Sequence, residues 1–383
     1  MTSRERVRNA LEHKPVDRVP VDIGGTPFTS MHVDAFRRYK ERLAPELPEE
    51  LMMLFTRTAY IPGAMRKMLG SDCCPIYPPL SAPKERIVTD AAGQETYVDE
   101  WGCKWGRPKD GLYYEVMTHP LMEVETAEEV DEQMTVPEDL DAAALAYMAQ
   151  QAQAAHTRTD AFVILNCPQN GGLLTRCAWL MGYEDYLVNI AQDPELVAHI
   201  VRKAKDALRR YLLQTLGSFG QYIDGLIVAD DLGTQIGPTM RPETYRTWFK
   251  PIWKELIQEV RAVAPHVKII MHSCGSIKEF FPDFVEIGVD ALNPVQISAR
   301  GMGDLEELKR AAEGKLAFWG GACNNQGTLE FAAPSDVADE VYRNAGQLGP
   351  TGLVLGSIQT VQVSAPEENV EMLYEAMQKY GSR

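Results

Sequence analysis

The chain has 383 residues, of which 45% are hydrophobic, and carries a formal charge of −16 with a pI near 5.0. Its length and apolar content are enough for one large domain or two medium ones. The acidic balance argues against nucleic acid and anionic membranes as main partners, because phosphate groups are bound by clustered cations. It also disfavours a substrate with many carboxylates.

Cysteine usage and hydropathy indicate the cellular compartment. The seven cysteines are odd in number and scattered, without the spacing of a small disulfide scaffold. The N-terminal segment lacks the apolar stretch of a signal peptide, and no run approaches the roughly 20 apolar residues of a membrane-spanning helix. We therefore expect a cytoplasmic protein with no membrane partner.

Short apolar runs recur along the chain and predict eight β-strands. They are Val19–Ile23, Cys73–Tyr77, Phe162–Asn166, Gly225–Asp230, Lys268–His272, Asp290–Pro294, Leu316–Gly320 and Gly352–Leu355. Long amphipathic segments lie between the later runs, over Glu195–Leu216, Pro242–Val263 and Val337–Leu348. This alternation is typical of βα units around a parallel sheet, and eight strands are the number in a (β/α)₈ barrel. No Pro/Gly/Ser-rich linker divides the chain, so we predict a single domain over residues 1–383.

Two regions fall outside this repeat. Val7, Ala10 and Leu11 share one helical face, which predicts an N-terminal helix with Ser3 as its N-cap. Between about Arg86 and Ala155 the chain is first aromatic and alternating and then acidic and alanine-rich, which predicts hairpins followed by a helix. The predicted fold is therefore an α/β protein, a (β/α)₈ TIM barrel with an N-terminal extension and an inserted lid.

The sequence KIIMHSCGS places His272 and Cys274 at the C-terminal end of a predicted strand, where a barrel carries its chemistry. Residues two apart in an extended chain can point to the same side, and imidazole and thiolate both bind zinc. Cys323 follows another strand and is the candidate third ligand, which would leave a fourth position open. The alternative is that the pair is a buried thiol and a hydrogen-bonded imidazole, and Cys323 a buried thiol in a glycine-rich loop.

Other polar residues also follow predicted strands. Asp230 and Asp231 are adjacent, so one is expected to face the barrel mouth and the other to position a loop. We assign catalysis to His272, Cys274 and Asp230. The candidates for substrate binding are Asn166, Asp231, Asn293, Gln296 and Trp319. For Trp319, the alternative is a plain core tryptophan.

Several segments together resemble the uroporphyrinogen decarboxylase superfamily. They are RERVRNALEHKPVDRVPVDIG, DEWGCKW, GLIVADDLGTQIGPTMRPETYR, HSCGSIKEFFPDFVEIGVDALNPVQ, LAFWGGACNNQGTLEFAAPSDV and VSAPEENVEML. The resemblance covers nearly the whole chain and implies a (β/α)₈ barrel. The superfamily contains decarboxylases of a polycarboxylate tetrapyrrole and cobamide-dependent methyltransferases, which exchange a methyl group with a corrinoid protein.

Two motifs favour the methyltransferase branch. The decarboxylases carry an arginine-rich segment after the first strand, suited to carboxylates, whereas residues Gly24–His32 contain no arginine here. The H-x-C at His272 and Cys274 resembles the zinc motif of the methyltransferases. The third cysteine of the thiol-methylating members is replaced by Ser357, so Cys323 or Asp230 would complete the site, or the metal is absent. This departure leaves O-demethylase-type or tetrahydrofolate-type transfer more open than transfer to a thiol.

The resemblance therefore implies a cobamide-dependent methyltransferase that moves a methyl group between a small substrate, such as a methyl ether, and a corrinoid, with zinc as Lewis acid. None of the seven histidines has an aspartate two residues before it, so the D-x-H-x-x-G motif of cobalt-binding proteins is missing and a separate corrinoid protein is the expected partner. The alternatives are a porphyrinogen decarboxylase and a non-catalytic binding protein on a degenerate barrel. Tyr113 and Tyr114 are candidates for a partner-facing surface, such as that of a homodimer.

Overall fold

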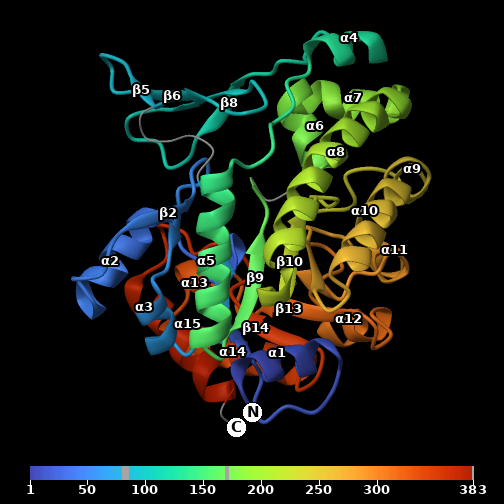
Figure 1. Cartoon of the computed structure of the whole chain (residues 1–383). Coiled ribbons are helices and arrows are strands. Elements are labelled where there is room, and N and C mark those ends of the chain that lie inside the picture. The colour runs from blue at the N-terminus through green and yellow to red at the C-terminus, as the bar shows by residue number, and fades with distance from the viewer. Residues whose placement is uncertain (80–85, 169–171, 382–383) are drawn as a thin grey trace.

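The computed structural model describes residues 1–79, 86–168 and 172–381, and its centre is a sheet of eight parallel strands (Figure 1). Around the sheet the order is β1, β14, β13, β12, β11, β10, β9 and β4. Their bounds are Val21–Asp22 (β1), Cys73–Ile76 (β4), Phe162–Asn166 (β9), Gly225–Ala229 (β10), Lys268–His272 (β11), Ala291–Asn293 (β12), Ala317–Gly321 (β13) and Leu353–Gly356 (β14). The predicted (β/α)₈ barrel and its eight strands are confirmed.

The strands form where apolar side chains alternate between the barrel interior and the helical layer. Phe162, Ile164, Ile227, Ile270 and Trp319 belong to one buried cluster that fills the interior. The intervening residues of the same strands, such as Val163 and Leu226, pack outward with the helices. Burial on both faces explains why these strands are almost continuously apolar in the sequence.

The barrel closes between β1 and β4 through Asp72, the residue before β4. Within the described residues these two strands share no ladder of paired residues. Instead, the Asp72 N–H donates to the Val21 carbonyl at 2.7 Å, and the Asp72 carboxylate accepts from the Val21 N–H at 2.8 Å. The same buried carboxylate forms ion pairs with Arg6 and Arg18 of the N-terminal extension, at 2.7 and 2.6 Å. We call this contact between β1 and β4 the seam.

Helices cover the outside of the barrel. The longer ones are α1 (Ser3–Leu11), α2 (Val33–Leu43), α5 (Ala142–Arg158), α6 (Leu174–Met181), α7 (Tyr183–Gln192), α8 (Pro194–Phe219), α10 (Lys250–Val263), α14 (Pro334–Leu348) and α15 (Glu367–Gly381). The shorter ones are α3 (Gly63–Met68), α4 (Ala127–Gln133), α9 (Pro242–Thr244), α11 (Phe281–Ile287), α12 (Leu305–Ala311) and α13 (Thr328–Phe331). Among the described residues, no helix has both the length and the apolar character needed to cross a bilayer.

The N-cap of α1 differs from the prediction by one residue. Thr2, and not Ser3, caps the helix: its hydroxyl accepts from the Glu5 N–H at 3.2 Å, and the Glu5 carboxylate accepts from the Thr2 N–H at 2.9 Å. This reciprocal pair satisfies two backbone donors at once, which a cap at Ser3 could not do because residue 6 is an arginine.

The inserted segment stands beyond the C-terminal ends of the barrel strands, at the top of Figure 1. It contains a four-stranded antiparallel sheet, β5 (Val88–Thr89), β6 (Glu95–Val98), β7 (Lys104–Arg107) and β8 (Glu115–Thr118), which we call the lid sheet. A smaller antiparallel hairpin, β2 (Glu50–Met53) and β3 (Thr58–Tyr60), precedes the inserted segment in the chain. Helix α5 contacts β4 and β9 as a barrel helix does, so the excursion ends before it rather than near Ala155.

Candidate functional site

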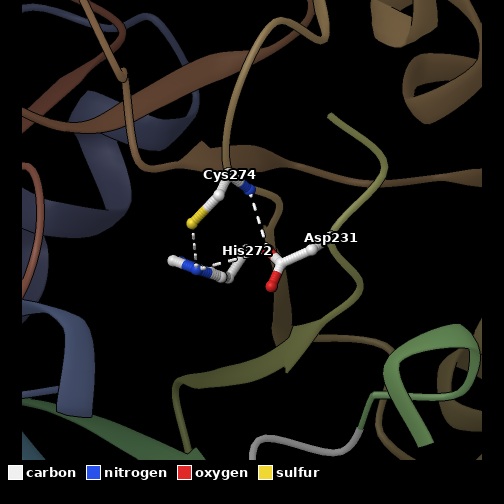
Figure 2. A group of neighbouring side chains, drawn as sticks. All are labelled: Asp231, His272 and Cys274. Carbon is white, nitrogen blue, oxygen red and sulfur yellow. Dashed lines mark hydrogen bonds and ion pairs between the residues drawn. The ribbon is translucent and has the colours of Figure 1, made fainter. Parts of the chain in front are cut away.

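Three side chains with metal-binding atoms meet where β10 and β11 end: Asp231, His272 and Cys274 (Figure 2). The Nε2 atom of His272 lies 3.1 Å from the Cys274 sulfur and 3.9 Å from an Asp231 oxygen. One donor atom from each residue lies within 4.8 Å of the other two. A nitrogen, a sulfur and an oxygen at this spacing fit zinc, which binds three such ligands in catalytic sites and leaves a fourth position open.

The glycine after Cys274 explains how this loop holds its shape. Gly275 has φ +84°, and a Cβ there would lie 2.5 Å from the Gly233 carbonyl carbon, so only glycine fits. The turn is held by the Gly275 N–H, which donates to Gln296 at 2.8 Å, and by the Cys274 N–H, which donates to Asp231 at 3.0 Å. The backbone thereby brings Cys274 and Asp231 to the same side as His272.

Burial governs the protonation of two candidate ligands, the buried His272 and the half-buried Cys274. It lowers the pKa of His272, against the opposing effects of Asp231 and of the hydrogen bond to Asn293. It raises the pKa of Cys274, an effect that the carboxylate of Asp231 reinforces. The metal-free site therefore contains a neutral imidazole and a protonated thiol, and metal binding would release the thiol proton.

A cavity of about 340 Å³ opens beside the three candidate ligands. Its walls are largely apolar, and four aromatic side chains contribute to them, Phe28, Phe55, Tyr113 and Trp179. The other lining residues are Pro27, Met53, Thr56, Thr58, Thr175, Asp231, His272, Cys274, Gln359, Thr360 and Gln362. None of these described residues is a lysine or an arginine. The cavity suits a small uncharged molecule and offers no cation to a carboxylate.

The two adjacent aspartates point in different directions, as expected, and Asp231 is the one at the mouth. Asp230 is buried and accepts from the N–H groups of Leu174 and Thr175, at 2.7 and 3.2 Å, and from the Trp253 indole at 2.7 Å. These bonds fix the start of α6. Burial raises the pKa of Asp230 to about 7. Asp230 therefore lies behind the cavity and holds α6, whereas we had predicted a catalytic role for it.

Cys323 is not brought to His272 and Cys274. Its buried thiol lies beside Glu340 of α14, and burial raises its pKa. The reason is the turn after β13, where the Asn344 amide holds the carbonyls of Gly321 and Ala322 at 3.2 and 3.3 Å and directs the chain toward α14. Among the described residues, the third candidate ligand is Asp231.

The remaining predicted substrate-binding residues lie behind the cavity wall. Gln296 accepts from the backbone of the Cys274 turn. Asn166 donates to the carbonyls of Gly25 and Ile164, at 3.3 and 3.2 Å. The Asn293 side chain lies 2.5 Å from the His272 ring. Trp319 is fully buried in the barrel interior, in agreement with the alternative that it is a core tryptophan. Only Asp231 of the five predicted substrate-binding residues lines the cavity.

Several lining residues were not predicted from the sequence. Gln359 donates its amide to the Cys274 sulfur at 2.8 Å, and Phe28 stacks on the His272 ring at a centroid distance of 3.4 Å. Gln359 lies shortly after β14, so the strand-end rule that selected Asn166 and Gln296 could have found it. Tyr114 is buried, whereas Tyr113 is half-buried and lines the cavity, so of this pair only Tyr113 can contribute to a partner-facing surface.

Comparison with known proteins agrees with this architecture. The family described as uroporphyrinogen decarboxylase (URO-D) matches residues 111–380. The chain is 22% identical over 182 residues to uroporphyrinogen decarboxylase 1, chloroplastic, of Oryza sativa subsp. japonica, a match over 48% of this chain and 41% of that protein. It is 23% identical over 187 residues to the uroporphyrinogen decarboxylase of Synechococcus sp. (strain JA-3-3Ab), over 49% and 47%. The chain thus spans less than half the length of these curated relatives.

A solved structure resembles the whole chain. The methyltransferase from Methanosarcina mazei superposes with a TM-score of 0.63 over 99% of both chains, at 16% sequence identity. At an identity this low, the superposition shows a shared fold and nothing about function. With the family match over more than half of its length, the chain belongs to the uroporphyrinogen decarboxylase (URO-D) family.

Proposed function

We propose that this protein is a methyltransferase that moves a methyl group between a small uncharged substrate, such as a methyl ether, and the corrinoid of a separate partner protein. The observation that carries the proposal is the meeting of Asp231, His272 and Cys274 beside an apolar cavity at the barrel mouth. The Methanosarcina mazei neighbour, a methyltransferase, has the same fold and supports it.

Zinc would be held by Nε2 of His272, the Cys274 thiolate and an Asp231 oxygen. When bound, it would supply Lewis acidity that stabilises negative charge on the atom that gains or loses the methyl group. The partner's cobamide would be the other methyl carrier. The residues of this chain would bind the substrate, orient it and exclude water from the methyl group.

Individual residues suit these tasks. Gln359 donates to the Cys274 sulfur and so stabilises a thiolate there. Phe55 and Trp179, whose rings meet edge to face at 5.1 Å, form an apolar wall that would orient a flat substrate and keep water out. Asp231, with 49% of its side chain exposed, is accessible from the cavity and can approach a bound metal.

A second candidate function is decarboxylation of a porphyrinogen, which the family name and the curated relatives favour. Such a substrate carries several carboxylates, which are bound most strongly by arginine. The described residues lining the cavity include no arginine or lysine, and one of them is the carboxylate Asp231. The charge of the cavity therefore favours methyl transfer.

Metal analysis and an activity assay together test the proposal. We expect about one zinc per chain in the purified protein, and little zinc in Asp231→Ala, His272→Ala and Cys274→Ser, because loss of one of three ligands removes much of the affinity. Cys323→Ser is the matched control and should keep its metal. The protein, mixed with a corrinoid protein from the same source, should demethylate compounds from a methoxylated panel. Full zinc occupancy in all three ligand variants, or release of carbon dioxide from a porphyrinogen, would contradict the proposal.

A further inference from the structure

We propose that Asn293 is a positioning residue that fixes the tautomer of His272, with the proton on Nδ1 and the lone pair of Nε2 directed into the site. The importance of this lone pair for metal binding rests on the proposed function. The tautomer itself is a property of the chain alone, and it can be measured without metal or substrate.

The hydrogen-bond chain leaves Asn293 one orientation. Its Nδ2 group donates to the Trp319 carbonyl at 2.9 Å, so its Oδ1 atom faces Nδ1 of His272 at 2.5 Å. An amide oxygen can only accept, and therefore Nδ1 must carry the proton. The opposite tautomer would bring a nitrogen lone pair against an oxygen lone pair in a fully buried position, where neither could find another donor easily.

The consequence lies on the other side of the ring. With its proton on Nδ1, a neutral His272 presents an unprotonated Nε2, the atom that faces the Cys274 sulfur at 3.1 Å and Asp231 at 3.9 Å. The ring plane is fixed as well, because Phe28 stacks on it with an angle of 8° between the planes. Orientation and tautomer of the imidazole are thus both set before any ligand arrives.

One buried carboxylate links the two supports of His272. Asp22 accepts from the Trp319 indole at 2.8 Å, and so holds the residue whose carbonyl orients Asn293. It also accepts from Thr29 and from the Gly25 N–H, each at 2.8 Å, and so holds the loop that carries Phe28. A Cβ at Gly25 would lie 2.4 Å from the Asp22 carboxylate, so glycine is required there. Asp22 therefore anchors both the ring stack and the amide.

Nitrogen-15 NMR of histidine in the metal-free protein near pH 7.5 tests the tautomer directly. In the wild type we expect a protonated Nδ1 and an unprotonated Nε2 for His272. Asn293→Leu removes the acceptor, so its His272 signal should shift toward the Nε2-protonated form, and the zinc affinity measured by chelator competition should fall about 10–100-fold. Asn293→Asp keeps an acceptor oxygen for Nδ1 and should keep the tautomer, although it loses the hydrogen bond to the Trp319 carbonyl and should be less stable than wild type.

Asn369→Leu is the matched control. Asn369 is, like Asn293, a buried asparagine, and its amide donates to two backbone carbonyls, at 2.9 Å each, in another part of the chain. This variant should lose stability without a change in the His272 signal. A wild-type spectrum with the proton on Nε2 overturns the inference, and this measurement needs no variant to fold. An unchanged tautomer in Asn293→Leu also overturns it. A protein that shows the expected tautomer but binds no zinc would overturn the proposed function and leave this inference standing.

Discussion

Asp230 and Asp231 carry the same functional group and differ in their surroundings. Asp231 is half-exposed and can approach a metal, whereas Asp230 is enclosed by Leu174, Thr175 and Trp253. In an extended chain, successive side chains point to opposite sides, so the sequence predicts that only one can face the mouth. Which one does so depends on where β10 ends, and that is decided by its pairing with β11 up to Ala229 and His272.

Asp230→Asn should flatten the pH dependence of stability. Burial raises the pKa of Asp230 from 3.8 to about 7, so the folded chain keeps a proton that the unfolded chain has released. The stability contributed by this proton is present below about pH 4 and is lost as the pH rises through about 7. The stability advantage of wild type over the variant should shrink by about 2–3 kcal/mol between pH 5 and pH 8, as measured by urea denaturation.

Asp139→Asn is the control for this measurement, because it removes a carboxylate whose side chain is 58% exposed. Its profile should run parallel to that of the wild type. A parallel profile for Asp230→Asn as well would mean that Asp230 is ionised in the folded protein throughout this range.

Gly275→Ala should destabilise the protein by more than about 2 kcal/mol, since the left-handed backbone alone costs about 1–2 kcal/mol and a clash with Gly233 adds to it. Zinc binding should weaken with it, because the same turn carries Cys274. Gly217→Ala is the control: Gly217 lies inside α8 with nothing within 4 Å of the added carbon. That variant should gain about 1 kcal/mol from helix propensity. Equal thermal melting of the two variants would contradict the strain assigned to Gly275.

At the level of elements, the H-x-C pair was predictable because both candidate ligands lie at one strand end, whereas the third candidate ligand, Asp231, comes from another element. Cys323 also follows a strand, but Asn344 of α14 holds the turn after β13 and directs the thiol to Glu340. No local pattern encodes that long-range contact. The aromatic wall of the cavity was missed for a similar reason, since Phe55 and Trp179 come from segments far apart in the sequence.

The lid sheet is attached to the barrel through tryptophans. Trp105 of β7 is buried, its ring lies 5.1 Å from Trp179 of α6, and its indole donates to Asp99 at 2.9 Å. Trp105→Ala removes a contact worth about 3–5 kcal/mol. We expect faster hydrogen exchange over β6 to β8, unchanged exchange in β10 and β11, and weaker substrate binding, because Trp179 lines the cavity.

Trp248→Ala is the control for the loss of a tryptophan, since Trp248 is half-buried in the segment before α10. It should leave exchange in the lid sheet unchanged. Uniformly faster exchange across the barrel in Trp105→Ala would show that lid and barrel unfold as one unit.

At the level of the whole molecule, the barrel was predictable because strands such as β9, β10 and β13 are apolar runs buried on both faces. The ends of α1 and of the inserted segment were harder to predict from the sequence. The T-x-x-E pattern at Thr2 and Glu5 identifies the N-cap, but it begins one residue before the serine. The end of the insertion could not be read from composition, because the alanine-rich α5 follows the acidic segment directly and only its packing on β4 and β9 makes it a barrel helix.

Metal removal should lower the stability of the whole barrel. A ligand at about 100 times its dissociation constant stabilises the folded state by about 2.7 kcal/mol, which corresponds to about 3 °C in melting temperature for a chain of this length. A strong chelator should therefore lower the melting temperature of the zinc-loaded wild type by about that amount. His272→Ala should melt at the same temperature with and without chelator. A chelator effect of the same size in both proteins would place the stabilising metal elsewhere.

Among the described strands, β1 and β4 are the neighbours around the barrel that share no strand ladder. In the order of strands around the barrel, β11 and β12, which carry His272 and Asn293, lie opposite the seam. Opening at the seam requires the loss of a few bonds centred on Asp72, whereas opening anywhere else breaks a strand ladder. Arg6 and Arg18 of the N-terminal extension therefore help to close the barrel, and their loss would free the β1 side, which carries Asp22 and the loop of Phe28.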